Sequence, residues 1–172
     1  YIADINEHIN HVFLKITGQS HLKVLYSPNI SISDFSTEIL KKELFCLYQK
    51  NLKRELMAGM TLYGPHRDDF SFLLDGKDMK VYSSQGQQKG AVLSYKLSTI
   101  PIFTKIKETS PVLLLDDIFS ELDISKKNKL LRFISKDIQS IITTTDLKNI
   151  SKKSLENAVI FQVNNGMIEK RS

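Results

Sequence analysis

Two adjacent carboxylates, Asp116 and Asp117, are the residues best placed to do chemistry, because they directly follow an apolar run at residues 112–115. Such a run predicts a strand buried on both faces, and ligands of a parallel sheet bind beyond the carboxyl ends of its strands. Mg2+ takes oxygen ligands and keeps several waters, so one aspartate can hold it beside phosphates. We therefore predict Asp116 as the metal ligand and Asp117 as the catalytic carboxylate that orients or deprotonates a water. Paired aspartates also occur where they only end a strand and cap a turn.

A second group of polar residues, Ser84, Gln85, Gly86 and Gln87, precedes a helical pattern. Ser84 and Gln87 have the spacing of a capping box, which satisfies backbone N–H groups at the start of a helix. The hydroxyl, the glycine that admits a ligand to the backbone and the positive end of the helix also suit a phosphate. Helix capping and phosphate binding are compatible, so both interpretations stand.

A third group of hydroxyls, residues 143–145, ends a further predicted strand and is followed by Asp146. Strand ends in such a sheet present its active edge, so the hydroxyls from Thr143 to Thr145 are candidates to sense a phosphate, with Thr144 and Thr145 as the pair selected. The alternative is that these hydroxyls satisfy the local backbone.

The phosphate loop G-x-x-x-x-G-K-[ST] is absent from the sequence. The nearest approximation runs from Gly59 to Gly64 but continues with Pro65 and His66, where lysine and a hydroxyl residue are required. A chain with metal carboxylates and no phosphate cradle can hold only part of a nucleotide site. We therefore expect that it does not hydrolyse ATP alone.

Helical and extended patterns alternate along the first part of the chain. An apolar stripe at Ile5, Ile9, Val12 and Ile16 predicts a helix that ends at Gly18. A short strand is predicted over residues 22–26, and Asp34 is the predicted cap of a long helix. The apolar stripes of that helix are expected to be core; they comprise Leu40, Leu44, Phe45, Leu47, Tyr48 and Leu52. A subdomain boundary is predicted near residue 59, where glycines break the pattern.

The second part of the chain predicts a partly parallel sheet. Residues 70–74 and 79–82 read as the two strands of a hairpin, and a helix follows from Gln85 that Pro101 should kink or split. The strand at 112–115, a helix near 124–134 and a strand at 138–142 follow one another, which implies a parallel, helix-covered sheet. A strand-turn-strand at 159–168 closes the chain. The fold class is mixed α/β.

Composition narrows the class of protein. The 172 residues are 41% hydrophobic and 25% charged, an ordinary globular balance. The sole cysteine, Cys46, excludes an intrachain disulfide and favours a reducing, cytoplasmic compartment. No apolar run reaches the ~18 residues that span a bilayer, so no membrane partner is predicted. Because the sequence begins with Tyr1 inside a helical pattern, we expect a piece of a longer protein.

Charge suggests a polyanionic partner. Lysine and arginine (24) exceed aspartate and glutamate (19) by 5, which favours nucleic acid through counterion release. The candidate contacts to duplex DNA are Lys126, Lys127 and Lys129, with Lys152 and Lys153. A solvated lysine-rich face is the alternative.

Arg67 and the pair His8 and His11 are two further sets of candidate functional residues. Arg67 follows a Gly-Pro turn and is a candidate interface or phosphate contact, whereas pairing with Asp68 or Asp69 would make it structural. His8 and His11 lie one helical turn apart, which suits half a metal site. With no third ligand in view, an exposed helix face is the favoured interpretation of this histidine pair.

Five motifs, in their order and spacing, resemble the RecF family. They are G-P-H-R-D-D at 64–69, S-Q-G-Q-Q at 84–88, L-L-L-D-D at 113–117, S-E-L-D at 120–123 and T-T-T-D at 143–146. The resemblance covers residues 61 to about 150. Residues 1–58 resemble only generally the helical second lobe of the family.

The resemblance implies an ABC-type ATPase head, related to those of structural-maintenance-of-chromosomes proteins. Residues 1–58 would be part of helical lobe II, and residues 59–172 the C-terminal half of lobe I. Asp116 would be the Walker B magnesium ligand and Asp117 the catalytic carboxylate. Ser84, Gln85, Gly86 and Gln87 would form the signature motif that faces the nucleotide of the other protomer. Ser120, Glu121, Leu122 and Asp123 would form the D-loop at the same interface, and Asp123 is also a candidate cap of the next helix.

The family also implies cofactors and partners: ATP, Mg2+, double-stranded and gapped DNA, a homodimer formed on ATP binding, and the RecO and RecR proteins. Its members help to load RecA at gaps in DNA repair and replication restart, with slow ATP hydrolysis. The family's phosphate loop and Q-loop lie N-terminal to the matched region, so the chain resembles a C-terminal half. It departs from the family pattern at Lys89 and Gly90, which stand where Arg-Thr is usual, and at Pro101.

Two other functions stay open from the sequence. A metal-dependent nuclease would use Asp116, Asp117 and Glu121 around two ions, but it leaves Ser84 to Gln87 without a role. A non-enzymatic DNA- or partner-binding fragment would keep its carboxylates for structure alone.

Overall fold

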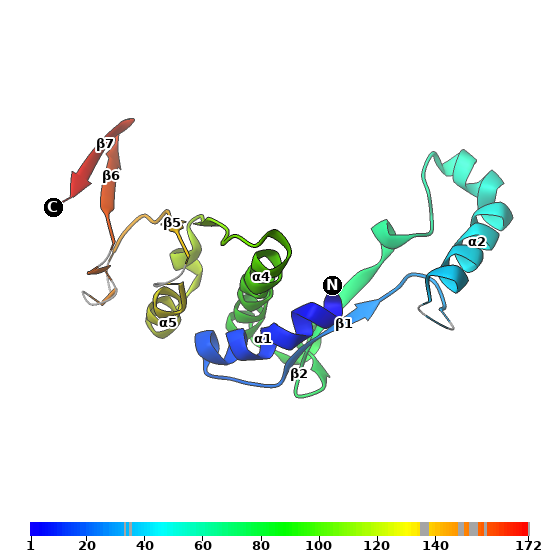
Figure 1. The fold of residues 1–172 in the computed structure, drawn as a ribbon, viewed down its shortest axis with the longest axis horizontal. Helices are drawn as coiled ribbons and strands as arrows, with labels where there is room; N and C mark the ends of the chain where they lie inside the picture. The colour runs from blue at the N-terminus through cyan, green and yellow to red at the C-terminus, as the bar shows by residue number, and fades with distance from the viewer. Residues whose placement is uncertain are drawn as a thin grey trace.

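The computed structural model describes residues 1–172 except 33, 35, 135–137, 148–149, 152–154, 157 and 172. The fold is mixed α/β, as predicted, and its elements are strung along one axis. Figure 1 shows α2 (Thr37–Ala58) at one end, the hairpin of β6 (Ile160–Asn164) and β7 (Met167–Arg171) at the other, and α1 (Ile2–Thr17), α4 (Gln85–Lys107) and α5 (Ile124–Ile134) between them. No helix in the described part of the chain is long and apolar enough to cross a membrane.

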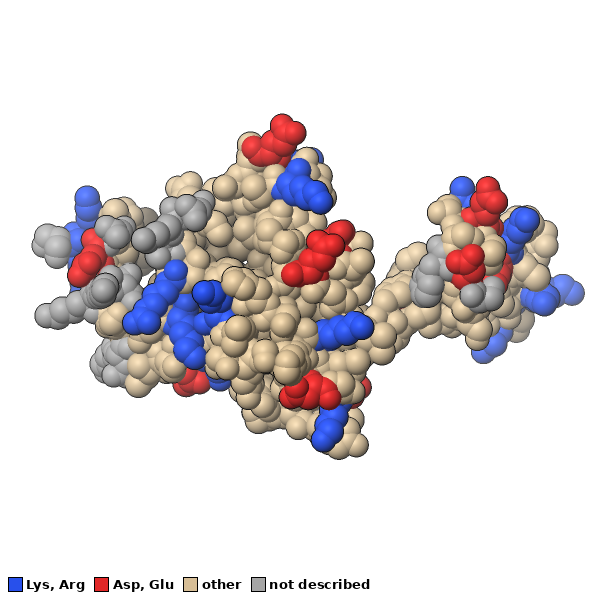
Figure 2. Space-filling view, turned by 60° about the horizontal axis from the view of Figure 1, so that its bottom comes forward, with Lys and Arg blue, Asp and Glu red and all other residues tan. Residues whose placement is uncertain are grey.

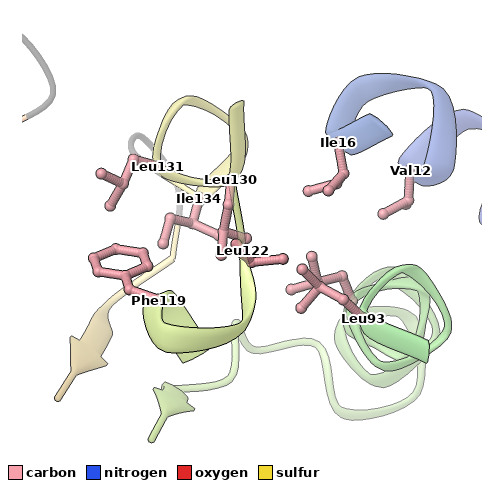
Figure 3. Close-up of a cluster of buried hydrophobic side chains, with 9 residues drawn as sticks. Val12, Ile16, Leu93, Phe119, Leu122, Leu130, Leu131 and Ile134 are labelled. Atoms are coloured by element: carbon pink, nitrogen blue, oxygen red, sulfur yellow. The ribbon is translucent and has the colours of Figure 1, made fainter. Parts of the chain in front are cut away.

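The centre is built from α1, α4 and α5. α1 buries the predicted stripe together with Phe13 and ends at Gly18, whose φ of 83° gives the left-handed cap. α1 packs against α4 and α5, and it takes part in both hydrophobic clusters of the protein. In the cluster of Figure 3, Val12 and Ile16 of α1 and Leu93 of α4 face Leu122 and the apolar side of α5.

A glycine allows α1 and α4 to approach closely. A Cβ on buried Gly90 would lie 2.8 Å from Cγ2 of Thr17, closer than side chains tolerate. A glycine therefore suits position 90, where a larger residue would push α1 and α4 apart. α4 runs unbroken through Pro101. Of the two effects predicted for this proline, a kink or a split, the split does not occur.

An antiparallel sheet, β1 (Leu22–Ser27), β2 (Asp69–Leu74) and β3 (Lys77–Asp78), packs beside α1. The predicted second hairpin strand at residues 79–82 is wrong, since these residues form the short helix α3 (Met79–Tyr82). The side chain of Asp78 accepts a hydrogen bond from the backbone N of Lys80 and so caps a helix where a strand was expected.

α2 buries none of its side chains, so the prediction that its apolar stripes are core is wrong. Phe45, Leu52 and Leu56 are 62%, 55% and 72% exposed. In the segment that follows the helix, the carbonyl of Tyr63 accepts from the Tyr48 hydroxyl, and the backbone N of Leu62 donates to Oε1 of Glu55. The N-cap is Ser36 rather than Asp34, whose carboxylate instead accepts from the backbone N of Ser36.

The parallel sheet consists of β4 (Leu113–Leu115) and β5 (Ser140–Ile142), joined through α5, as predicted. The prediction that the first strand is buried on both faces is wrong. Leu113 and Leu115 pack against the α1–α4–α5 cluster, whereas Leu114 is 69% exposed and Ile141 on β5 is 54% exposed. In the described part of the chain, this sheet is covered on one face.

The last elements, β6 (Ile160–Asn164) and β7 (Met167–Arg171), form the predicted hairpin. Asn165 and Gly166 both have positive φ, 48° and 81°. Two such residues make the turn whose twist suits a two-residue hairpin loop.

Candidate functional site

The predicted metal carboxylate meets the hydroxyl run at the carboxyl edge of β4 and β5. Leu115 pairs with Ile142, so the next residues, Asp116 and Thr143, come opposite each other. The Thr143 hydroxyl donates to Oδ1 of Asp116 and accepts from the backbone N of Asp117 at 3.0 Å. Both carboxylates are exposed. The arrangement fixes one carboxylate oxygen and leaves the others open to a cation or water.

Asp117 stands at a sharp bend. Its φ of 45° lies in the left-handed region, and it begins the 3-10 helix η2 (Ile118–Glu121). The backbone N and the hydroxyl of Ser120 both donate to the carbonyl of Asp117, at 3.2 and 2.8 Å. A non-glycine residue at positive φ is uncommon and is often found where function constrains the backbone. The bend places two successive carboxylates at one sheet edge.

The capping box at the start of α4 is confirmed. The backbone N of Gln87 donates to Oγ of Ser84 at 3.3 Å, and the backbone N of Ser84 donates to Oε1 of Gln87 at 2.9 Å. The Gln87 amide also contacts the side chain of Gln19, just beyond α1, at 3.4 Å. Ser84 and Gln85 are exposed, so the positive end of a 23-residue helix is open to an anion.

The four residues 120–123 link the two motifs. Leu122 is buried in the α1–α4–α5 cluster, while Ser120, Glu121 and Asp123 are exposed. A carboxylate oxygen of Glu121 lies 3.8 Å from Nζ of Lys89 on α4, so this departure from the family pattern reaches the segment directly.

Asp123 caps α5, as predicted. Its Oδ1 accepts from the backbone N of Lys126 at 2.9 Å, and its Oδ2 pairs with the Lys126 ammonium at 2.9 Å. Bonding to Lys126 holds the pKa of the Asp123 carboxyl below its ordinary value.

The hydroxyls predicted to sense phosphate differ in their contacts. Thr144 donates to the backbone carbonyl of Asp146 at 2.9 Å, which is the local role, and Thr145 is exposed. Thr143, the first of the three hydroxyls that the sequence singled out, is the threonine that contacts the carboxylate edge. The parallel register explains this contact, because it sets the residue after β5 opposite the residue after β4.

Arg67 lies apart from these motifs, on the 3-10 helix η1 (Pro65–Arg67) at the end of the antiparallel sheet. Its guanidinium donates to the carbonyl of Thr61 and to the sulfur of Met60. Asp68 accepts instead from the hydroxyl of Tyr26, which raises the Tyr26 pKa to about 12, chiefly through that hydrogen bond.

The candidate DNA lysines differ in the protein groups that their ammonium groups contact. Lys126 pairs with Asp123, the Lys127 ammonium lies 6.0 Å from the ring centre of Phe119, and Lys129 approaches Gly18. Lys152 and Lys153 lie outside the described residues. Figure 2 shows a compact group of basic side chains on one face, whereas basic and acidic side chains intermingle over the end that contains α2.

Neither alternative metal site is assembled. Among the residues that the structure describes, no three His, Cys, Asp or Glu side chains come together as a metal group. Glu121 turns toward Lys89, so a two-ion site with Asp116 and Asp117 lacks its third carboxylate. His8 and His11 line a groove of about 740 Å3 together with apolar residues of α4 such as Leu97 and Ile100; His8 is half-buried and His11 is exposed.

Comparison with curated proteins finds relatives over nearly the whole chain. A DNA replication and repair protein RecF of Lactobacillus delbrueckii subsp. bulgaricus is 40% identical over 172 residues, which is 98% of this chain and 45% of the relative. RecF of Limosilactobacillus reuteri is 36% identical over 171 residues, 99% of this chain and 44% of the relative. The chain thus spans less than half the length of these relatives, and it matches their C-terminal half. No protein-family model matches it.

Solved structures agree. The recombination mediator protein RecF with ATP, of the RecFOR pathway, aligns with all of this chain and 44% of its own, at a TM-score of 0.75 and 30% identity. A structure from work on ATP-driven dimerisation and DNA-stimulated activation of SMC ATPases aligns with 99% of this chain and 85% of its own, at a TM-score of 0.56 and 16% identity. At that identity the second match supports the fold alone.

Proposed function

The chain belongs to the RecF family, whose C-terminal half it matches, and we propose that it supplies one side of an ATP site that forms between two heads. The observation that carries this proposal is the carboxylate edge. Asp116 and Asp117 are exposed at the carboxyl ends of a parallel strand pair, held by Thr143, in a chain without a phosphate loop. Such an edge suits phosphoryl chemistry whose phosphate cradle lies elsewhere.

The residues at this edge fit a magnesium ion, because Mg2+ prefers few carboxylates and keeps water and phosphate ligands. Asp116 would hold the ion, which when bound would neutralise developing charge on the phosphates. Asp117 would orient or deprotonate the attacking water. Thr143 would keep the Asp116 carboxylate in one orientation, since it already donates to one of its oxygens.

The second surface would act on the nucleotide of the other head. Ser84, Gln85, Gly86 and Gln87 at the start of α4 would offer a hydroxyl and backbone N–H groups to a phosphate. The segment 120–123 would cross the same interface as the D-loop. Residues 1–58 would complete part of a helical lobe, and Arg67, beside that lobe, would act as an interface or phosphate contact.

In a whole RecF protein we further propose that ATP binding favours the dimer and slow hydrolysis releases it, a shift driven by differential binding to the two states. DNA at gaps would be the substrate and RecA loading the outcome, with RecO and RecR as partners. Lys127 and Lys129 are the better DNA candidates within the described lysines, because Lys126 is paired.

Two titrations test the divided site. Mg-ATP added to this chain alone should produce no measurable heat. The chain should instead associate with the full-length Lactobacillus delbrueckii RecF when a non-hydrolysable ATP analogue is present. Sedimentation of the fluorescently labelled chain measures this association. Gly86→Glu should weaken that association at least about tenfold by setting a carboxylate against the phosphates. Val92→Glu, at an exposed position of the same helix, adds the same charge and is the control. Tight magnesium-dependent binding of ATP by the chain alone would contradict the proposal.

A further inference from the structure

The Lys126 ammonium lies between the two motifs assigned to the interface. Its Nζ is 2.9 Å from Oδ2 of Asp123, at the end of the 120–123 segment, and 3.5 Å from the place where a Cβ on Gly86 would be. The Lys126 side chain is 21% exposed, whereas that of Asp123 is 55% exposed. The ammonium is therefore drawn inward, toward the first turn of α4.

Asp123 is bound to Lys126 twice. One carboxylate oxygen accepts from the backbone N of Lys126 and the other from its ammonium. The first bond is an ordinary helix cap and needs no particular side chain at position 126. The second depends on the lysine, and it carries the end of the segment toward Gly86.

A second lysine provides an internal comparison. Lys89, one turn into α4, reaches Glu121 in the same segment at 3.8 Å, and both side chains are about half exposed, at 46% and 52%. Exposed pairs at this separation contribute little. The Lys89–Glu121 pair joins α4 to the segment in solvent. The Lys126–Asp123 pair joins the segment to the first turn of α5, and it is the partly buried Lys126 ammonium that lies against Gly86 at the start of α4.

We propose that Lys126 is a positioning residue that fixes the 120–123 segment against the start of α4, so that both meet a partner's nucleotide as one surface. The nucleotide part of this inference rests on the proposed function, but the fixing of one motif against the other does not. A lysine held in this way is withdrawn from the DNA contacts suggested by the sequence.

The first test uses this chain without nucleotide. Amide hydrogen exchange followed by NMR should show Gln88, whose backbone N bonds the carbonyl of Ser84, and Leu122 exchanging faster in Lys126→Met, by up to about fivefold. Lys126→Arg should restore the exchange, and Lys89→Met should change it much less. If Lys126 served only α5, exchange would rise at Lys127 and stay unchanged at Gln88, and this result would overturn the proposal.

The second test adds the nucleotide. Association of the chain with full-length Lactobacillus delbrueckii RecF and the ATP analogue should weaken about fivefold in Lys126→Met and recover in Lys126→Arg. Association that is unaffected by Lys126→Met would overturn the positioning role at the interface. If the unsubstituted chain does not associate at all, the proposed function fails, and the exchange measurement still decides whether Lys126 joins the two motifs.

Discussion

The helices α1 and α2 differ in how many of their side chains are buried. Both carry apolar residues at helical spacing, and both end in a glycine with positive φ. α1 buries five side chains between α4, α5 and the antiparallel sheet, whereas α2 buries none. The amphipathic period predicts that a helix forms, but it does not identify what the helix packs against.

The largest expected effect comes from truncating the same residue type in each helix. Phe13 on α1 is fully buried and touches the core, while Phe45 on α2 is 62% exposed. Phe13→Ala should lower the free energy of unfolding by about 3–5 kcal/mol through lost burial and a cavity. Phe45→Ala should change it by less than about 0.5 kcal/mol. Urea denaturation of both variants makes the comparison, and equal losses would mean that α2 is covered in solution.

The next effect tests how tightly α1 is held. Gly90→Ala puts a methyl group 2.8 Å from Thr17 Cγ2, so the helices must separate, at an expected cost of about 1–3 kcal/mol. Gly86→Ala in the same helix meets only the flexible end of Lys126 at 3.5 Å and should be nearly neutral. Thermal unfolding followed by circular dichroism distinguishes the two. A neutral Gly90→Ala would show that α1 and α4 have room to adjust.

A smaller effect is expected at the carboxylate edge. Thr143→Val removes the hydroxyl that joins Asp116 to the backbone N of Asp117, and it should cost about 1 kcal/mol. Thr145→Val, at an exposed neighbouring position, should cost less than about 0.5 kcal/mol. Chemical denaturation measures both changes in the free energy of unfolding. The NMR chemical shift of the Asp116 carboxyl carbon should change in Thr143→Val and stay unchanged in Thr145→Val.

The smallest effect concerns pH. The pKa of Asp123 is lowered in the folded state by Lys126, so its stabilisation is full above the ordinary pKa of 3.8 and is lost as the pH falls through the lower folded value. Because the Asp123 side chain is 55% exposed, Asp123→Asn should cost less than about 1 kcal/mol near pH 7. The difference between variant and parent should shrink as the pH falls below 3.8 and vanish once the pH is below the lowered folded pKa of Asp123. A constant difference across pH would point to the cap geometry alone.

Local features of the fold were predictable because neighbours in sequence decide them. The cap at Gly18, the capping box of Ser84 and Gln87, and the turn at Asn165 and Gly166 each depend on a few adjacent residues. The helix at 124–134 and the parallel pairing of its flanking strands also follow from spacing and from connection rules.

Some errors were local, such as the helix at 79–82 that Asp78 caps, but others concern contacts between distant segments. Leu114 looks like a core residue in any strand of leucines, but its exposure depends on what lies over the sheet. The same holds for Leu52 on α2. At the candidate site, the sequence singled out Asp116, Asp117 and the hydroxyls from Thr143 to Thr145. It did not predict that Thr143 bonds Asp116, because that contact depends on the register in which two strands pair.

The narrow β4–β5 sheet has a practical consequence. A two-stranded parallel pair has no inner strand, so the outer side of each strand leaves backbone N–H and C=O groups without a neighbouring strand in the described chain. Together with the outward-facing Leu114 and Ile141, these edges resemble the templates on which chains add to one another during aggregation. Association through these edges would limit the concentration at which the isolated chain can be handled.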